Sequence, residues 1–240
     1  MVAGCELSLF CAGYLPGPTL GDRLDVLTGA APAPGLQASF SKLPRVLNTT
    51  LGQSVAAIRD YFRGPVTYAS APWEAVDWAQ FDLVSVDLYR DSSNAAGYRD
   101  SLRSYTRFGK PVVVSEFGCC TYKGAADAGG SGFMVVDYDT QPPALKLKVT
   151  GLQRSEAEQS CYLRELLAIF GEEGAHGAFW HTFAGWTFPY RPDPRSDLDL
   201  GSFGLVKVIE APPADKEAVV LEPKEAFWAL AAAYRQAGGR

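Results

Sequence analysis

Apolar residues along the chain follow two alternating periods, and this alternation predicts strands followed by helices. Strands are predicted where short apolar runs are rich in β-branched or aromatic residues, and helices where apolar side chains recur every three or four positions. The predicted strands span 2–10, 65–70, 81–89, 111–117 and 177–183, and the predicted helices span 41–62, 94–108, 155–170 and 223–234. Repeated strand–helix units are typical of a parallel sheet with helices outside it.

The segment KPVVVSEFG, residues 110–118, is the most informative part of the chain. An uninterrupted β-branched run indicates a strand that is buried on both faces, as in parallel sheets. A carboxylate at the end of such a strand raises the free energy of folding unless it has a partner or a role. Glu116 is therefore a catalytic candidate. The alternative is a structural glutamate that pairs with an arginine or caps a neighbouring loop.

Composition and charge narrow the class of protein. The chain has 240 residues, of which 47% are hydrophobic, and we expect one domain over residues 1–240. A formal net charge of −5 without long Lys/Arg clusters argues against nucleic acid or an anionic membrane as a partner. The sequence contains neither a long apolar span nor the features of a signal peptide, which predicts a cytoplasmic location.

Cysteine and histidine spacing predicts neither a disulfide framework nor a metal site. The five cysteines are dispersed, apart from the adjacent pair Cys119 and Cys120, and the only histidines are His176 and His181. We therefore expect reduced thiols, no metal and no cofactor. Two further acids, Asp197 and Asp199, lie in a polar stretch after the last predicted strand. They could bind a cation, although alternating acids in a loop are more often solvated.

Polar and aromatic residues follow the predicted strands where each strand ends. They are Glu6, Trp73, Glu74, Asp87, Tyr89, Glu116, Trp180 and His181. The carboxyl ends of parallel strands meet at one edge of a sheet, where barrel and open α/β enzymes carry their active sites. We therefore expect these side chains to lie on one face.

Glu6 and Glu116 could form the carboxylate pair of a glycosidase. A separation of about 5–5.5 Å would give retention of configuration, and about 6.5–9.5 Å would admit an inverting water. Aromatic rings suit stacking on sugars, although each tryptophan taken singly is more often a rim or core residue. The aromatic candidates are Trp73, Trp78, Tyr89, Trp180 and Trp186. The predicted substrate-binding residues are Tyr89, Trp180, Trp73, Glu74, His181 and Asp87.

The strand-end residues carry a resemblance to a known group of enzymes. Glu6, Tyr89, the VVVSEFG block with Glu116 and the AFWH strand with Trp180 resemble strands four, six, seven and eight of the retaining (β/α)8 glycoside hydrolases of clan A. The resemblance implies that Glu6 is the acid/base and Glu116 the nucleophile. It also implies that Tyr89 bonds the nucleophile and that Trp180 floors the sugar subsite. A carbohydrate ligand is the implied partner.

Three blocks more specifically resemble a bacterial family labelled abortive phage infection protein: GCELSLF at 4–10, YASAPWE at 68–74 and EFGCCTYKGAAD at 116–127. That label implies a role in phage defence. Clan A enzymes usually carry an asparagine before the acid/base, where it binds the sugar 2-hydroxyl, and this chain has Cys5 there. Because a thiol is a poor donor, Cys5 favours a second hypothesis, a noncatalytic carbohydrate-sensing or protein-interaction module. Glu74 is a competing acid or, more simply, a solvated loop residue.

The number of predicted strands is smaller than a closed barrel requires. A barrel of this class has eight strands and about 250 residues, and the five predicted strands correspond to strands four to eight. We therefore predict an α/β fold that is an incomplete (β/α)8 barrel, truncated at its N-terminus. Its outer strands would be bare edges through which the chain could self-associate. The long connection at 119–154 predicts a small hairpin over the site, or a mobile excursion.

Overall fold

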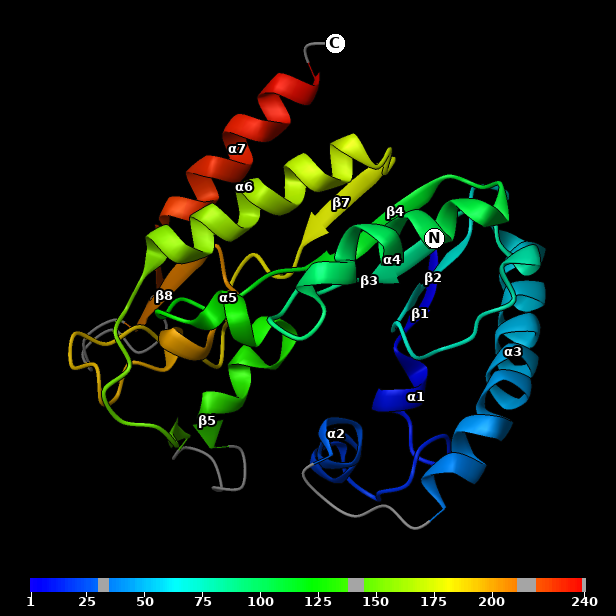
Figure 1. Ribbon diagram of the computed structural model, residues 1–240, viewed down its shortest axis with the longest axis horizontal. Coiled ribbons are helices and arrows are strands. Elements are labelled where there is room, and N and C mark those ends of the chain that lie inside the picture. The colour runs from blue at the N-terminus through cyan, green and yellow to red at the C-terminus, as the bar shows by residue number, and fades with distance from the viewer. Residues whose placement is uncertain (30–34, 138–144, 211–218, 239–240) are drawn as a thin grey trace. The chain divides into compact units, whose positions relative to one another are not determined.

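The computed structural model describes residues 1–29, 35–137, 145–210 and 219–238, and shows the predicted α/β fold. Five strands form one sheet in the order β1-β2-β3-β4-β7, in which β1 pairs with β2 and β2 with β3 in parallel (Figure 1). These strands are β1 (Val2–Cys5), β2 (Thr67–Ser70), β3 (Val84–Asp87), β4 (Val112–Phe117) and β7 (Gly177–Trp180). The strand predicted at 2–10 is shorter than expected, because α1 (Leu7–Phe10) follows it.

The chain divides into two compact units. The first comprises residues 1–88 and 104–115, and the second comprises residues 89–103 and 116–240. Strand β4 contributes its beginning to the first unit and its end to the second. The helical segment predicted at 94–108 also passes from one unit to the other, as η2 (Ala95–Gly97), α4 (Tyr98–Ser104) and η3 (Tyr105–Phe108).

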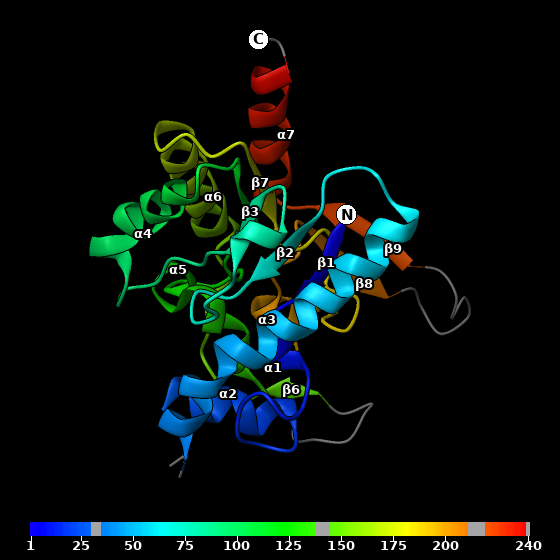
Figure 2. The same ribbon diagram turned by 90° about the vertical axis from the view of Figure 1, so that its right-hand side faces the viewer.

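The core of the first unit lies between its strands and α3 (Leu36–Tyr61), which contacts β1 and crosses in front of it in Figure 2. The predicted apolar stripe of this helix is confirmed, since Leu43, Leu47 and Leu51 are buried. The β-branched and aromatic residues of β2 and β3 are buried as well, which agrees with strands covered on both faces. Besides α1, two described elements of this unit were not predicted, namely α2 (Leu20–Thr28) and η1 (Trp78–Gln80).

The second unit packs α6 (Glu156–Glu172) and α7 (Glu225–Gly238) together beside β7 (Figure 1). The predicted cap of α6 is present, because Ser155 Oγ accepts the Glu158 N–H at 3.2 Å. Glu158 accepts instead from the N–H groups of Gly124 and Ala126, so the capping box is not reciprocal. Pro223 ends a strand and lies before α7 rather than in its first turn.

Short elements fill the two long connections of the second unit. The connection after β4 holds α5 (Ala125–Ala128), η4 (Gly129–Val135) and an antiparallel pair, β5 (Val136–Asp137) with β6 (Lys146–Leu147). This antiparallel pair agrees with the predicted hairpin, whose place over the site stays a prediction, and its connection at 138–144 lies outside the described residues. After β7 come η5 (Leu198–Gly201) and the unpredicted antiparallel pair β8 (Val206–Glu210) and β9 (Val219–Pro223). Among the described helices, none has the length and apolar character needed to cross a membrane.

Candidate active site

The predicted site residues fall into two groups, one in each compact unit. Glu6, Trp73, Glu74 and Asp87 lie in the first unit together with Cys5, and Tyr89, Glu116, Trp180 and His181 lie in the second. Each of these residues lies at the end of a strand or in the segment that follows it. That all of them lie on one face stays a prediction. The separation of the Glu6 and Glu116 carboxylates, which belong to different units, stays a prediction.

Glu116 is the centre of the second group. It is the fifth residue of β4, and its side chain is 25% exposed. The Tyr89 hydroxyl donates to Glu116 Oε2 at 3.0 Å, and His181 Nδ1 lies 3.7 Å from Oε1. The hydrogen bond predicted between Tyr89 and Glu116 is therefore present. An accessible carboxylate with a phenol donor on one oxygen is suited to covalent chemistry at the other.

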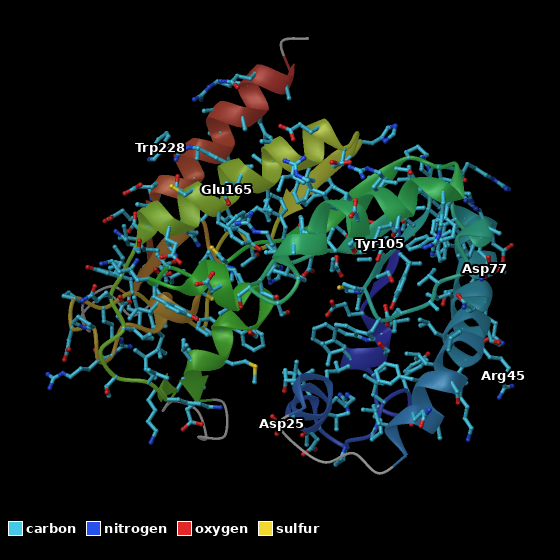
Figure 3. The ribbon with its side chains drawn as sticks, in the orientation of Figure 1. Asp25, Arg45, Asp77, Tyr105, Glu165 and Trp228 are labelled. Carbon is cyan, nitrogen blue, oxygen red and sulfur yellow. The ribbon has the colours of Figure 1, made fainter. Side chains whose placement is uncertain are left out.

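The segment that carries Tyr89 is held in place by contacts of its neighbour Arg90. The Tyr162 hydroxyl accepts the Arg90 N–H at 2.9 Å and donates to the Arg90 carbonyl at 2.8 Å. The Arg90 guanidinium forms an ion pair with Glu165, which is labelled on α6 in Figure 3. Gly130 also packs closely against Tyr89, because a Cβ there would lie 3.0 Å from the Tyr89 ring. These contacts restrain the phenol that bonds Glu116.

Trp180 and Phe203 form the aromatic part of the second group. The Trp180 indole N–H donates to the Phe203 carbonyl at 2.8 Å, and its ring meets Phe117 edge-on at 5.3 Å between centroids. The centroid of the Phe203 ring lies 5.7 Å from that of the Tyr89 ring and 5.8 Å from that of the His181 ring. Sequence analysis missed Phe203, whose signal is only an aromatic between Ser202 and Gly204 in a loop. Trp180 is 8% exposed, so its role as a sugar platform stays a prediction.

The aromatic candidate Trp78 is a core residue. It is 3% exposed and packs against Phe81, with ring centroids 5.7 Å apart. Trp186, in contrast, is 63% exposed.

Asp87 organises part of the first group. It is 1% exposed and accepts from Ser115 Oγ at 2.6 Å, and the Cys5 thiol lies 3.5 Å from its other oxygen. Cys5 thus directs its weak donor at a buried carboxylate. Ser115 was not identified from the sequence, because the strand pattern gives no reason to prefer a serine there.

Glu6 connects β1 to α1 in a left-handed conformation, with φ 39° and ψ 46°. Among the described residues other than glycine, it alone has a positive φ.

The other two candidates of the first group are Trp73 and Glu74. Trp73 Nε1 donates to Ser8 Oγ at 3.0 Å. Glu74 is only 6% exposed, so its interpretation as a solvated loop residue is wrong.

Asp197 and Asp199 are neither solvated nor arranged as cation ligands. Both are buried, and Arg154 Nη2 lies 2.8 Å from a carboxylate oxygen of each. Lys224 Nζ, itself fully buried, lies 2.9 Å from Asp199 Oδ1. Burial raises the pKa of Asp199, and the two cations oppose that shift. The acidic stretch therefore forms a structural ion-pair network.

Comparisons with known proteins connect the fold to glycoside hydrolases. No protein-family model matches the sequence, and neither does any curated protein sequence. Among solved structures, a GH113 β-1,4-mannanase matches with a TM-score of 0.51 at 19% identity, covering 78% of this chain and 51% of that chain. The GH113 β-mannanase of Alicyclobacillus acidocaldarius in complex with ManMIm matches with a TM-score of 0.50 at 16% identity, covering 81% and 52%. The chain therefore has a glycoside hydrolase-like fold and spans about half the length of the mannanases that it matches.

Proposed function

We propose that this chain carries the catalytic residues of a retaining glycoside hydrolase, with Glu116 as nucleophile and Glu6 as acid/base. The observation that carries the proposal is the hydrogen bond from Tyr89 to Glu116, at the end of strand β4 in a glycoside hydrolase-like sheet. Glu116 would attack the anomeric carbon while Glu6 protonates the departing oxygen. Water would then release the sugar, with Glu6 acting as the base. Carbohydrate is accordingly the proposed ligand.

The proposed substrate class is a β-linked glycoside. This extension rests on the solved structures that share the fold, which are named as β-1,4-mannanases. Trp180, His181, Trp73 and Asp87 are the proposed contributors to sugar binding. The assay panel should therefore include β-1,4-mannan and aryl β-mannosides beside other glycosides.

The test uses the different tasks of the two carboxylates. Glu116→Ala removes the nucleophile and should abolish turnover, whereas Glu6→Ala removes only proton transfer. Aryl glycosides with good leaving groups should still form the glycosyl-enzyme in Glu6→Ala, and added azide should restore release. Asp60→Asn on α3, an exposed acid, serves as the control and should leave turnover unchanged. Equal activity in wild type and Glu116→Ala would contradict the proposal.

A noncatalytic carbohydrate-sensing or protein-interaction module in phage defence is the second candidate. Cys5 favours it, because Cys5 occupies the position at which clan A enzymes usually carry the asparagine that binds the sugar 2-hydroxyl. The Cys5 thiol faces Asp87 instead. This candidate predicts sugar binding without hydrolysis. Calorimetric titration of wild type and Glu116→Gln against the same panel separates the two candidates. Binding that is unchanged by Glu116→Gln, with no cleavage of any substrate, would favour the module.

A further inference from the structure

Two of the sequence blocks described above, GCELSLF at 4–10 and YASAPWE at 68–74, are hydrogen-bonded to each other in the first unit. The Leu7 N–H donates to the Tyr68 hydroxyl at 2.7 Å, and the Ser8 N–H donates to Glu74 Oε1 at 2.9 Å. In addition, the Trp73 indole N–H donates to Ser8 Oγ. The bonds join residues more than sixty positions apart, so the second block holds the turn that carries Glu6.

Glu74 is the centre of this network. Its two oxygens accept from three donors: the Ser8 N–H, the Ala71 N–H at 3.0 Å and the Tyr68 hydroxyl at 3.0 and 2.9 Å. Burial, followed by the negative charge of Glu74, raises the pKa of Tyr68. The phenol therefore stays protonated, accepts from Leu7 and donates to Glu74.

The bonded N–H groups belong to the first turn of α1, where a helix has no internal acceptors. Glu6 is the N-cap residue of this helix, yet its side chain makes no capping bond. Glu74 and Tyr68, from another segment of the chain, accept the hydrogen bonds of these N–H groups instead. In addition, the Glu6 N–H donates to the Ala69 carbonyl of β2 at 2.9 Å, so both sides of Glu6 are fixed to the same segment.

This arrangement explains how Glu6 keeps its left-handed backbone. Residues other than glycine adopt such a conformation only where the surrounding structure imposes it. We propose that Glu74 and Tyr68 are positioning residues, which hold the Glu6 turn in the conformation that presents Glu6 as acid/base. The proposal rests on the function proposed above for Glu6. It assigns Glu74 no contact with substrate and removes it as a competing acid.

The first experiment measures the turn itself and needs no activity. Amide hydrogen exchange and the HN–Hα coupling of Glu6, which reports its φ, are measured by NMR in wild type, Glu74→Gln and Tyr68→Phe. The Leu7 and Ser8 amides should exchange at least tenfold faster in both variants, and the Glu6 coupling should move toward the extended value. Asp60→Asn and Tyr61→Phe are the matched controls, because Tyr61 is 93% exposed and Asp60 is exposed beside it. Unchanged exchange and coupling would overturn the proposal. Tyr68→Phe keeps the ring, so it remains informative if Glu74→Gln does not fold.

The second experiment separates positioning from general stability. Glycosides with poor leaving groups need the acid, whereas those with good leaving groups do not. Each variant should therefore lose kcat/KM at least tenfold more on poor than on good leaving groups. An equal loss on both would mean that the network is merely structural and would overturn the proposal. If wild type cleaves nothing, the proposed function fails, and the exchange and coupling data still decide whether Glu74 and Tyr68 hold the turn.

Discussion

The Tyr89 hydroxyl donates to Glu116 Oε2 at 3.0 Å, although the two residues belong to different strand–helix units of the sequence. His181 lies near the other oxygen of the same carboxylate. The donor is held by its neighbour Arg90, whose backbone is bonded on both sides by Tyr162. The geometry of this carboxylate thus depends on two loop segments, which carry Tyr89 and His181, and on α6, which carries Tyr162.

Removing the Tyr89 hydroxyl should weaken catalysis in the proposed enzyme. A hydrogen bond to a charged group is worth about 1.5–3 kcal/mol, so we expect Tyr89→Phe to lower kcat roughly 10–100-fold. Steady-state kinetics on an aryl glycoside measures the effect. Tyr234→Phe is the control, since it removes a hydroxyl from a half-exposed residue on α7. Equal kcat in the two variants would show that the Tyr89 bond has no catalytic role.

Gly129 should tolerate no side chain. Its φ is 53°, and a Cβ would lie 2.4 Å from the Arg90 carbonyl oxygen. Gly129→Ala should therefore lower the free energy of unfolding by more than the ~1–2 kcal/mol of a left-handed residue. Gly124→Ala is a matched control, because Gly124 has φ 86° and nothing within 4 Å of the added Cβ. Urea denaturation of both variants tests the difference, and equal losses would mean that the contact with Arg90 relaxes at no cost.

The sequence predicted those features that follow from local pattern. Helix α3 was identified because its apolar residues recur at helical spacing, and strand β4 because its β-branched run is uninterrupted. The Tyr89–Glu116 contact was predicted from a resemblance, which carried tertiary information that periodicity lacks. Strand β9 was missed because all its residues are exposed and its pairing with β8 is antiparallel.

Glu74 illustrates what local pattern could not supply. Its neighbours in sequence suggest a solvated loop, but its donors are set by tertiary structure, and one of them, Ser8, is 66 residues away. Lys224 presents the same difficulty, because a lysine beside Pro223 gives no sign of full burial. Buried charges are predictable only when their partners are known.

Lys224 should be essential for stability. Replacing it by methionine removes the ammonium that lies 2.9 Å from Asp199, and breaking a buried pair from one side costs about 3–5 kcal/mol. Burial raises the pKa of Asp199 in the folded protein. The contribution of this carboxyl to stability is therefore lost as the pH rises through that folded-state pKa. The deficit of Lys224→Met should therefore be largest at neutral pH and shrink in acid, as Asp199 takes up a proton. Denaturation at pH 7 and pH 4 measures it, with exposed Lys123→Met as control. A deficit that grows in acid would contradict this explanation.

Asp82 should make the first unit sensitive to acid. Hydrogen bonds from Arg59 and then from the Val66 N–H lower the pKa of Asp82. A carboxyl with a lowered folded pKa stabilises the protein above its unfolded pKa of about 3.9, and that stability is lost as pH falls through the folded value. Asp82→Asn should therefore be less stable than wild type at pH 6 but similar at pH 2. Asp60→Asn should follow the wild-type curve at both values, and a constant deficit of Asp82→Asn would exclude titration of Asp82 as the cause.

The outer strands of the sheet should cause self-association. Among the described residues, the sheet ends at β1 and β7, where Val2 is 56% and Phe179 is 59% exposed. Open strand edges with exposed apolar side chains pair with other chains, and a lysine on the edge prevents this. We expect concentration-dependent dimers or larger species in size-exclusion chromatography, and a shift toward monomer in Phe179→Lys. Val46→Lys is the matched control, because Val46 is 40% exposed on α3 and not on a strand. A wild-type monomer with a cooperative two-state melt would contradict both the association and the prediction of an incomplete barrel from which it follows.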